Sequence, residues 1–152
     1  MGCDIHFIVE QKYPSEWVGV YSSDEYKFRR EKDWDTATPM ELMDNRHYDF
    51  FGLLANVRRE PQPGSEDPRE MPDDLSSWSR AELEEGKLDW HSASWHSLEE
   101  FVKKYLLSNA DDAKKAELMA AKLQGENPMH KFLPRVRPEE WHKYRVVFWF
   151  DN

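Results

Sequence analysis

Alternation of hydrophobic and polar residues at the start of the chain predicts a β-hairpin. Residues 3–10 alternate for most of their length, which is typical of a strand that buries one face. Turn-forming residues at 13–15 separate this segment from a second apolar segment at 17–21. We therefore expect the two segments to pair in an antiparallel manner.

The last apolar segment, residues 144–150, predicts a further strand. We expect it to pair with residues 3–10, because both segments are apolar enough to occupy central positions in a sheet. Residues 24–35 mix charged and aromatic side chains and fit either a third strand or an irregular arm.

Apolar residues recur at helical spacing in two segments between these strands. Residues 48–59 carry Phe50, Leu53 and Val57 on one face and predict a core helix. Residues 97–106 begin with a capping box and continue with an apolar face, so a second core helix is expected there. Capping patterns and composition predict three more helices: Thr38 to about Asp44, one that begins at Ser79, and Lys114 to Leu123 with Gly125 as its stop.

Two segments predict loops. Residues 60–78 contain four prolines and several acidic residues, and long ordered loops of this kind are frequently functional. Residues 89–96 are polar and aromatic and also predict a loop. Together the elements predict an α+β fold, in which an antiparallel sheet includes the N-terminal hairpin and the C-terminal strand and two or three helices pack on one face.

Composition narrows the class of protein. The length of 152 residues predicts a single domain, 1–152, and the 14% of aromatic residues can supply a compact core. The single cysteine excludes an intrachain disulfide, and there is no apolar segment of the roughly 20 residues that a membrane span needs, so we expect a cytoplasmic protein that does not bind membranes. A net charge of −9 argues against binding of duplex nucleic acid but allows a small anionic ligand held by a few arginines.

Asp4 and His6 form the first candidate for chemistry. Residues two apart in a strand lie on the same face, which places the two side chains about 6–7 Å apart. A carboxylate and an imidazole in this arrangement suit metal ligation, acid–base catalysis or ligand binding. An exposed polar sheet face explains the pattern equally well.

Arg46, Asp49 and Arg58 form the second candidate. Positions 46 and 49 lie on or beside the apolar face of the predicted core helix, where a charged side chain is costly unless it is paired or lines a cavity. One interpretation is an ion pair between Arg46 and Asp49, and the other is a helix start that faces an anion-binding site. Arg58, further along, is a second candidate for an anion.

The third candidate is the segment that contains His91, Ser92, Ser94 and Trp95. Its serines and histidines offer hydrogen-bond partners, and a tryptophan face can stack on a base or a sugar. No glycine-rich phosphate loop, zinc-binding HExxH helix or GxSxG nucleophile motif accompanies it. A packed loop whose polar groups satisfy the backbone remains the alternative.

Five sequence blocks together resemble a family of small bacteriophage and bacterial proteins that begin with the same six residues. The blocks are Met-Gly-Cys-Asp-Ile-His, Arg46-x-Tyr48-Asp49-x-Phe51-x-Leu53-Leu54-Ala55-x-Val57-Arg58, Pro68-Arg69-x-x-Pro72-x-Asp74-x-Ser76, His91-Ser92-x-Ser94-Trp95 and Phe148-x-Phe150-Asp151-Asn152. By analogy with other small accessory phage proteins, the resemblance implies a role in the cytoplasm of the host cell. Such proteins often counter host defences, and several bind or cut nucleotide second messengers.

The leading hypothesis is therefore a phage-type accessory protein that binds a small anionic, nucleotide-like ligand without a required cofactor. The expected ligand-binding residues come from all three candidate segments: Asp4, His6, Arg46, Asp49, Arg58, His91, Ser92, Ser94 and Trp95. The arginines would neutralise phosphate, the aspartates would accept hydrogen bonds and a tryptophan would stack on the base.

Two alternatives remain open. A metal-dependent phosphodiesterase would use Asp4, His6, Asp49 and His91 as ligands of Zn, Mn or Mg, with His6, His91 and Asp49 as the candidate catalytic residues. An acidic protein-interaction module that inhibits a host protein would explain the net charge. The sequence leaves homo-oligomerisation open.

Overall fold

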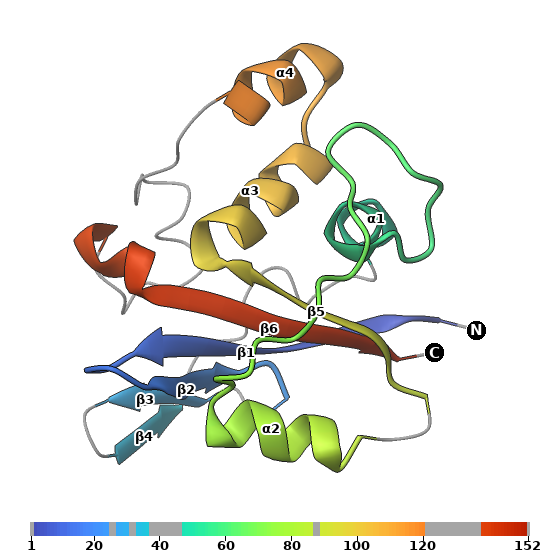
Figure 1. Cartoon of the computed structure of the whole chain (residues 1–152). Helices are drawn as coiled ribbons and strands as arrows, with labels where there is room; N and C mark the ends of the chain where they lie inside the picture. The colour runs from blue at the N-terminus through green and yellow to red at the C-terminus, as the bar shows by residue number, and fades with distance from the viewer. Residues whose placement is uncertain are drawn as a thin grey trace.

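A computed structural model describes residues 2–24, 27–30, 33–36, 47–86, 89–120 and 138–151. These residues form a six-stranded antiparallel sheet with the strand order β4-β3-β2-β1-β6-β5. The strands are β1 (Asp4–Lys12), β2 (Trp17–Ser22), β3 (Lys27–Arg30), β4 (Asp33–Thr36), β5 (His91–Ser97) and β6 (Tyr144–Asp151). Figure 1 shows β1 and β6, the first and last strands of the chain, side by side.

The pairing of β1 with β6 confirms the prediction made from their apolar patterns. The register runs from Asp4 opposite Asp151 to Gln11 opposite Tyr144. Every residue of β6 from 144 to 150 is buried, and β1 is buried on both faces in its middle. The predicted hairpin of β1 and β2 is also present.

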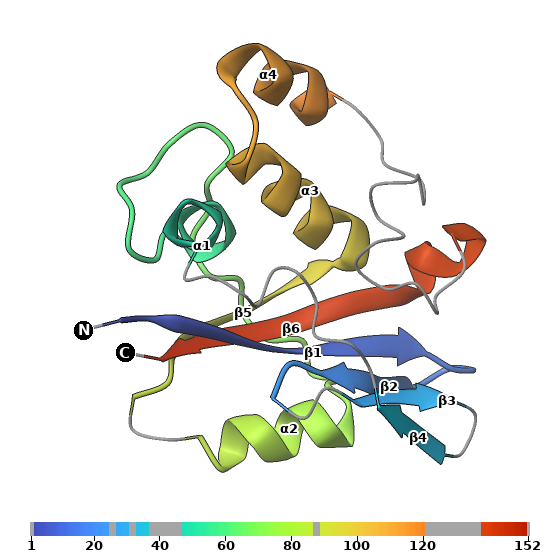
Figure 2. The same ribbon diagram turned by 180° about the vertical axis from the view of Figure 1, so that it is seen from behind.

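Helices cover both faces of the sheet. They are α1 (Tyr48–Ala55), α2 (Ser77–Glu84), α3 (Leu98–Ser108), α4 (Asp112–Ala120) and the 3-10 helix η2 (Pro138–Lys143). α1 and α3 lie over one face and α2 lies over the other, as the two opposite views show (Figures 1 and 2). The α+β architecture is thus confirmed, with α2 as an additional layer. None of the described helices has the length and apolar composition needed to cross a bilayer.

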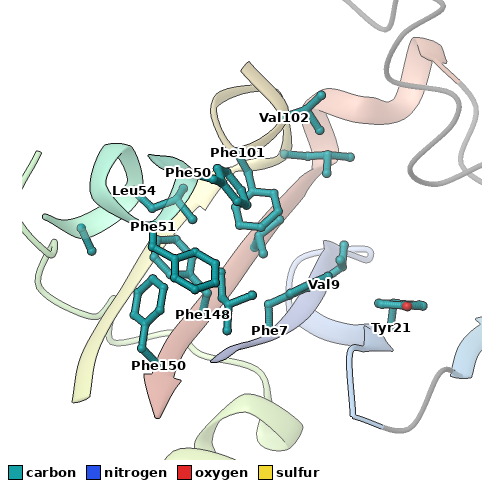
Figure 3. Close-up of a cluster of buried hydrophobic side chains, with 14 of the residues drawn as sticks. Phe7, Val9, Tyr21, Phe50, Phe51, Leu54, Phe101, Val102, Phe148 and Phe150 are labelled. Carbon is teal, nitrogen blue, oxygen red and sulfur yellow. The ribbon is translucent and has the colours of Figure 1, made fainter. Parts of the chain in front are cut away.

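Aromatic rings fill the space between the sheet and the helices α1 and α3 (Figure 3). Phe101 of α3 lies at the centre, with ring centroids 5.5 Å from Phe7, 5.2 Å from Phe50 and 5.7 Å from Phe148. Buried aromatic pairs at these separations add favourable edge and stacking contacts to the large apolar area that they remove from water.

Helix boundaries follow local capping groups. Ser97 caps α3 with the predicted capping box. α2 begins two residues before the predicted Ser79, because the Ser76 side chain accepts the Ser79 amide and makes residue 76 the cap. α1 ends at Ala55 rather than near residue 59, since Asn56 adopts a left-handed conformation with φ of 54°.

The prediction of a loop at residues 89–96 is wrong, because most of this segment is the edge strand β5. It pairs with β6 from His91 opposite Phe150 to Ser97 opposite Arg145, with an irregularity between residues 91 and 94. Ser94 and His96 are buried beneath the helices although they are polar, so hydrophobic alternation alone does not reveal the strand.

A segment that we call the strap, residues 60–76, forms most of the predicted long loop and crosses the edge of β5. The Ser94 hydroxyl accepts the Arg69 amide at 2.8 Å on the helix α3 side of the sheet. The Trp95 indole donates to the Glu70 carbonyl at 3.1 Å, and residue 95 points to the opposite face. The strap therefore passes from one face of the sheet to the other between residues 69 and 70, as Figure 1 shows between α1 and α2.

Several predicted features fall outside the described residues. These are the helix at 38–44 and the helix stop at Gly125. The helix predicted at 114–123 is described as far as Ala120, within α4. Of residues 24–35, Asp24 lies in the turn after β2, and the other described residues belong to the strands β3 and β4.

A buried ion pair joins β1 to β6 beneath α2. The Arg145 Nε donates to Glu10 Oε1 at 2.5 Å, and the Glu10 side chain is fully buried. The other Glu10 oxygen accepts the Ser76 amide at 2.7 Å, where α2 is capped. Arg145 also donates to the side chain and the carbonyl of Asp74, and its guanidinium lies 4.0 Å from the ring centroid of Trp17.

We predict that Arg145→Ala destabilises the protein by about 3–5 kcal/mol, because it leaves the Glu10 carboxylate buried without its partner. The double variant Glu10→Met/Arg145→Met should lose less, since it removes both charges and keeps the buried volume. Urea unfolding measures the difference. Arg80→Ala, at an exposed position, is the matched control and should change stability by no more than about 0.5 kcal/mol. A double variant that is less stable than Arg145→Ala would contradict this account.

Candidate functional site

The candidate site is built around the end of the sheet where β1 begins and β6 finishes. Asp4 lies opposite Asp151, and His6 lies opposite Trp149. On the other side of β6, His91 begins β5 opposite Phe150. Side chains alternate between the two faces, so Asp4 and His6 lie on the face of α2, whereas His91 stacks on Phe150 on the face of α1.

His6 is held by two carboxylates. Its Nδ1 lies 2.7 Å from Asp24 Oδ1, and its Nε2 lies 2.6 Å from Asp151 Oδ2. Burial alone would lower the pKa of His6, but the hydrogen bonds to Asp24 and Asp151 outweigh it and raise the pKa to about 9. The ring is therefore a cation at neutral pH with both nitrogens occupied, and it cannot act as a general base in this state.

Cys3 directly precedes β1 and lies near groups from both faces of the sheet. Its amide donates to the Tyr48 hydroxyl at 3.2 Å, and Asp4 and Asp151 lie within electrostatic range of its thiol. Burial raises the pKa of Cys3, which outweighs the opposing hydrogen bond from Arg58. The residue is therefore a buried thiol rather than a reactive thiolate.

Arg58 lies beside this thiol, and both Arg58 and Arg59 lie over the Tyr48 ring. Each guanidinium is 5.8 Å from the centroid of the Tyr48 ring, so two positive charges share one aromatic side chain. Arg58 has a φ of 62°, a left-handed conformation that is uncommon for residues other than glycine. Arg59 pairs with Asp49 at 2.8 Å, and both side chains are about half exposed.

The structure does not bring Asp49 to His6. Asp49 lies on α1, on the other face of the sheet, and the hydrogen bond from Arg59 lowers its pKa. The predicted partner Arg46 lies outside the described residues. Within the part of the chain that the structure describes, Asp49 is therefore a surface partner of Arg59.

Three further residues of β5 were predicted to bind the ligand: Ser92, Ser94 and Trp95. Their contacts in the structure differ. The Ser92 hydroxyl lies 2.9 Å from the His91 Nδ1, and Ser92 has a φ of 55°. Ser94 and Trp95 instead hold the strap in place through the hydrogen bonds described above. Asn56, Arg58 and Ser92 are the non-glycine residues with positive φ among those described. Such backbone strain concentrates at functional sites, which directs attention to positions 58 and 92.

Asp24 and Asp151 belong to the site although the sequence did not single them out for chemistry. Trp90 also belongs to it, and it lies in the segment 89–96, whose tryptophans are expected from the sequence to stack on a base. The centroid of the Trp90 ring lies 5.8 Å from that of His6 and 5.0 Å from that of Trp149. A signal for Asp151 was present, because the expected pairing of the first and last strands places it near Asp4. Asp24 follows β2 in a turn, and no pattern in the sequence indicates its contact with His6.

The described residues include no group of three or more histidine, cysteine, aspartate or glutamate side chains arranged to hold a metal ion. The four predicted ligands Asp4, His6, Asp49 and His91 are divided between the two faces of the sheet. The metal-dependent alternative therefore gains no support from the described part of the chain.

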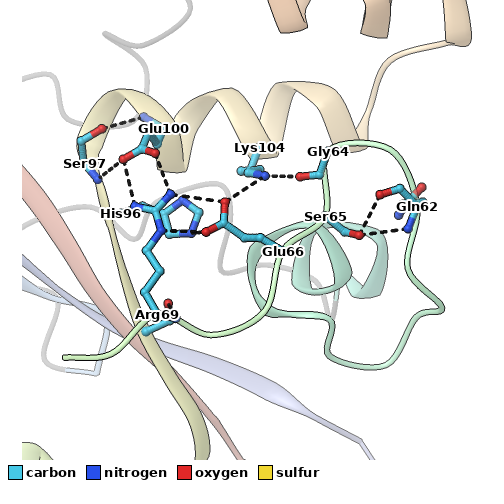
Figure 4. A network of polar contacts seen from close by, with 10 residues as sticks. Gln62, Gly64, Ser65, Glu66, Arg69, His96, Ser97, Glu100 and Lys104 are labelled. Carbon is cyan, nitrogen blue, oxygen red and sulfur yellow. Dashed lines mark hydrogen bonds and ion pairs between the residues drawn. The ribbon is translucent and has the colours of Figure 1, made fainter.

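A second polar cluster links the strap to α3 (Figure 4). Arg69 binds Glu66 at 2.7 Å and Glu100 through two hydrogen bonds of 2.7 and 3.1 Å. Burial opposes ionisation of Glu100, but the hydrogen bonds from Arg69 lower its pKa to about 2. Lys104 of α3 adds an ion pair to Glu66 at 3.3 Å and a hydrogen bond to the Gly64 carbonyl.

His96 lies beneath this cluster and is fully buried. Neither ring nitrogen has a hydrogen-bond partner among the described residues, and Glu66 Oε1 lies 3.7 Å away. Burial, assisted by the charge of Arg69, lowers the pKa of His96 to about 4. The imidazole is therefore neutral at pH 7 and is surrounded by paired charges.

No known protein family, curated protein or solved structure matches this chain. The resemblance to the phage and bacterial family therefore stays a prediction, and the geometry of the site carries the functional argument.

We predict that the pKa of His6 measured by NMR titration lies near 9 and falls by at least about one unit in Asp24→Asn, which removes one of the two charges. Because the folded pKa exceeds the unfolded value of about 6.5, His6 stabilises the fold fully below pH 6.5 and this contribution is lost as the pH rises through 9. Asp73→Asn, at an exposed position in the strap, is the control. An unchanged pKa in Asp24→Asn would contradict the assignment.

For His96 we predict that its contribution to stability changes with pH in the opposite direction to that of His6. The folded pKa of about 4 lies below the unfolded value of about 6.5, so stability falls as the pH drops from 6.5 towards 4. His96→Leu removes the buried nitrogens and therefore does not lose this stability in acid. The unfolding free energy of the variant minus that of the wild type should rise by about 2 kcal/mol when the pH is lowered from 7 to 5. Urea unfolding at the two pH values measures this. Comparison with the wild type cancels the titration of Glu66 and Glu100, and an equal difference at both pH values would refute the assignment.

Proposed function

We propose that the protein binds a small anionic, nucleotide-like ligand at the end of the sheet formed by β1 and β6. Its phosphate group would lie against Arg58 and Arg59. Its sugar or base would pass over the end of the sheet beside Cys3 to the group formed by His6, Asp24, Asp151 and Trp90, which lies on the opposite face from Asp49, the partner of Arg59. This is the leading prediction from the sequence, with His6 and Arg58 retained from the predicted binding residues and with four residues added from the geometry: Arg59, Asp24, Asp151 and Trp90.

The arginine pair is the observation that carries the proposal. Both guanidiniums lie 5.8 Å from the centroid of the Tyr48 ring, so an oxyanion beside this ring could accept hydrogen bonds from either of them. The pair of Arg59 with Asp49 is exposed, and exposed ion pairs contribute only about 0–1 kcal/mol, so a phosphate could take the place of Asp49 at little cost.

The adjoining acidic group supports a ligand with hydroxyl or amino donors at its other end. Asp24 and Asp151 are partly exposed and present carboxylate oxygens to solvent. Carboxylates accept hydrogen bonds from ribose hydroxyls and base amines, and the partly exposed Trp90 offers a stacking surface. The chain can thus bind one small anion despite its net charge of −9.

Binding is favoured over turnover by the states of two titratable groups in the site, Cys3 and His6. Cys3 is a buried thiol, and His6 is a cation with both nitrogens hydrogen-bonded. Neither state provides a nucleophile or a general base. The resemblance to phage proteins suggests that the ligand is a nucleotide second messenger of host defence, which the protein would sequester in the host cytoplasm.

We predict that Arg58→Gln lowers the affinity for such a ligand at least tenfold, equivalent to about 1.4 kcal/mol, because it removes one guanidinium from the anion. Thermal unfolding with AMP, ADP-ribose and a cyclic dinucleotide identifies the ligand, since saturation at 100 times Kd adds about 2.7 kcal/mol of stability. Calorimetry of the variants then gives the affinities.

Arg80→Gln, an exposed arginine on α2, is the matched control and should bind like the wild type. Wild-type affinity in folded Arg58→Gln would remove the arginine pair from the site, and the absence of a shift with every phosphate compound would refute the proposal. Chromatography of the incubated compounds for products distinguishes an enzyme from a binding protein.

A further inference from the structure

The imidazole of His96 is enclosed between the sheet, the helix α3 and the strap. Its ring packs on Phe148 of β6, with 5.4 Å between the ring centroids. The ring is fully buried, and neither of its nitrogens has a hydrogen-bond partner among the described residues. The charged groups that face it come from the strap and from α3, as Figure 4 shows: Glu66, Arg69, Glu100 and Lys104.

A proton on His96 would have no acceptor within hydrogen-bonding distance among the described residues. The Oε1 of Glu66 lies 3.7 Å from the His96 Nε2, and it already accepts a hydrogen bond from Arg69 at 2.7 Å. The other Glu66 oxygen pairs with Lys104 at 3.3 Å. The two acidic and two basic groups of the cluster cancel, so protonation of His96 would leave one net positive charge in a buried place.

Residues 64–70 of the strap, which include Glu66 and Arg69, buy little apolar burial. Their sequence is Gly-Ser-Glu-Asp-Pro-Arg-Glu, and none of the seven residues is fully buried. Met71 and Leu75, which follow, instead pack against the apolar cluster beneath α2. Because a segment with few buried apolar contacts opens at a low cost in free energy, residues 64–70 are the part of the strap best able to open on their own.

Polar contacts hold this segment against the rest of the molecule. The residues that bind it all do so through side-chain atoms, and they are Asn56, Ser94, Trp95, Glu100 and Lys104. Among the described residues, no hydrogen bond between backbone groups joins residues 64–70 to β5. The segment can therefore leave β5 without breaking the pairing of β5 with β6.

We propose that residues 64–70 form a latch that opens locally in acid when His96 accepts a proton. In the closed state the latch covers a neutral imidazole. In the open state the imidazole contacts water, which favours its cationic form, so uptake of a proton favours opening. Loss of the proton near neutral pH closes the latch again. Opening does not require the ligand proposed above.

The size of the effect follows from the two states of His96. Burial, assisted by the charge of Arg69, lowers the pKa of His96 to about 4 in the closed state, whereas an imidazole in water has a pKa of about 6.5. The closed state is therefore fully favoured above pH 6.5 and becomes less favoured as the pH falls towards 4. This linkage makes the equilibrium constant for opening about 20 times larger at pH 5 than at pH 7. The pKa values of Glu66 and Glu100 are lowered, so both stay ionised over this interval.

Hydrogen exchange of the Arg69 amide, followed by NMR, tests the latch, because opening breaks the bond of this amide to Ser94. After correction for the intrinsic pH dependence of exchange, the opening constant should rise about 20-fold between pH 7 and pH 5. In His96→Gln, whose side chain stays neutral, the rise should be less than about twofold. His142→Gln, at an exposed histidine, is the matched control and should keep the wild-type rise.

Low concentrations of urea distinguish local opening from unfolding of the whole chain. Local opening exposes little surface, so the exchange of the Arg69 amide should be nearly independent of urea. The Phe7 amide, which is buried in β1 and donates to Ser23, should exchange more slowly and respond steeply to urea. An Arg69 amide with the same exchange rate and the same urea response as Phe7 would overturn the latch.

Three other results would also overturn it. The first is an opening constant of the wild type that does not change between pH 7 and pH 5. The second is a rise that persists without the imidazole, and His96→Leu makes this comparison if His96→Gln fails to fold. The third is a His96 ring that is largely protonated at pH 5 while the Arg69 amide is as well protected as at pH 7, because the closed segment would then accommodate the charge.

Discussion

The buried contact between Arg145 and Glu10 sets the geometry on which the rest of the molecule depends. It joins the two central strands, and through Asp74 and Ser76 it also fixes the end of the strap and the start of α2. A shift of one residue in the pairing would turn Glu10 towards the phenylalanine core, where no partner for its charge exists among the described residues. The contact therefore favours the one register in which Asp4 meets Asp151 and His6 meets Trp149.

The elements that the sequence predicts correctly are those in which local and tertiary preferences agree. The alternating pattern of residues 3–10, the apolar segment 144–150 and the capping box at Ser97 each have one favourable interpretation, and the structure has all three. Pairing of the two outer segments of the sequence also follows, since both need a central position. This pairing accounts for part of the candidate site, because it brings Asp151 next to Asp4 and His6.

The parts that could not be predicted depend on contacts between segments far apart in the chain. β5 buries Ser94 and His96, whose polarity conceals the strand, and Ser94 is satisfied by a backbone amide of the strap 25 residues away. Asp24 joins the site through a turn whose direction the sequence does not specify. Likewise, Asp49 occupies a helical position that pattern alone assigns to the core side, whereas the early end of α1 brings Arg59 back to pair with it at the surface.

The strap has a consequence for the behaviour of the protein in acid. It covers β5, whose outer side would otherwise offer unpaired amides and carbonyls to a strand of another molecule. Its attachment depends on ionised Glu66 and Glu100 around a neutral His96, and protonation of all three at low pH would weaken it. If the strap detached in acid, the outer edge of β5 would be open to a strand of a second molecule.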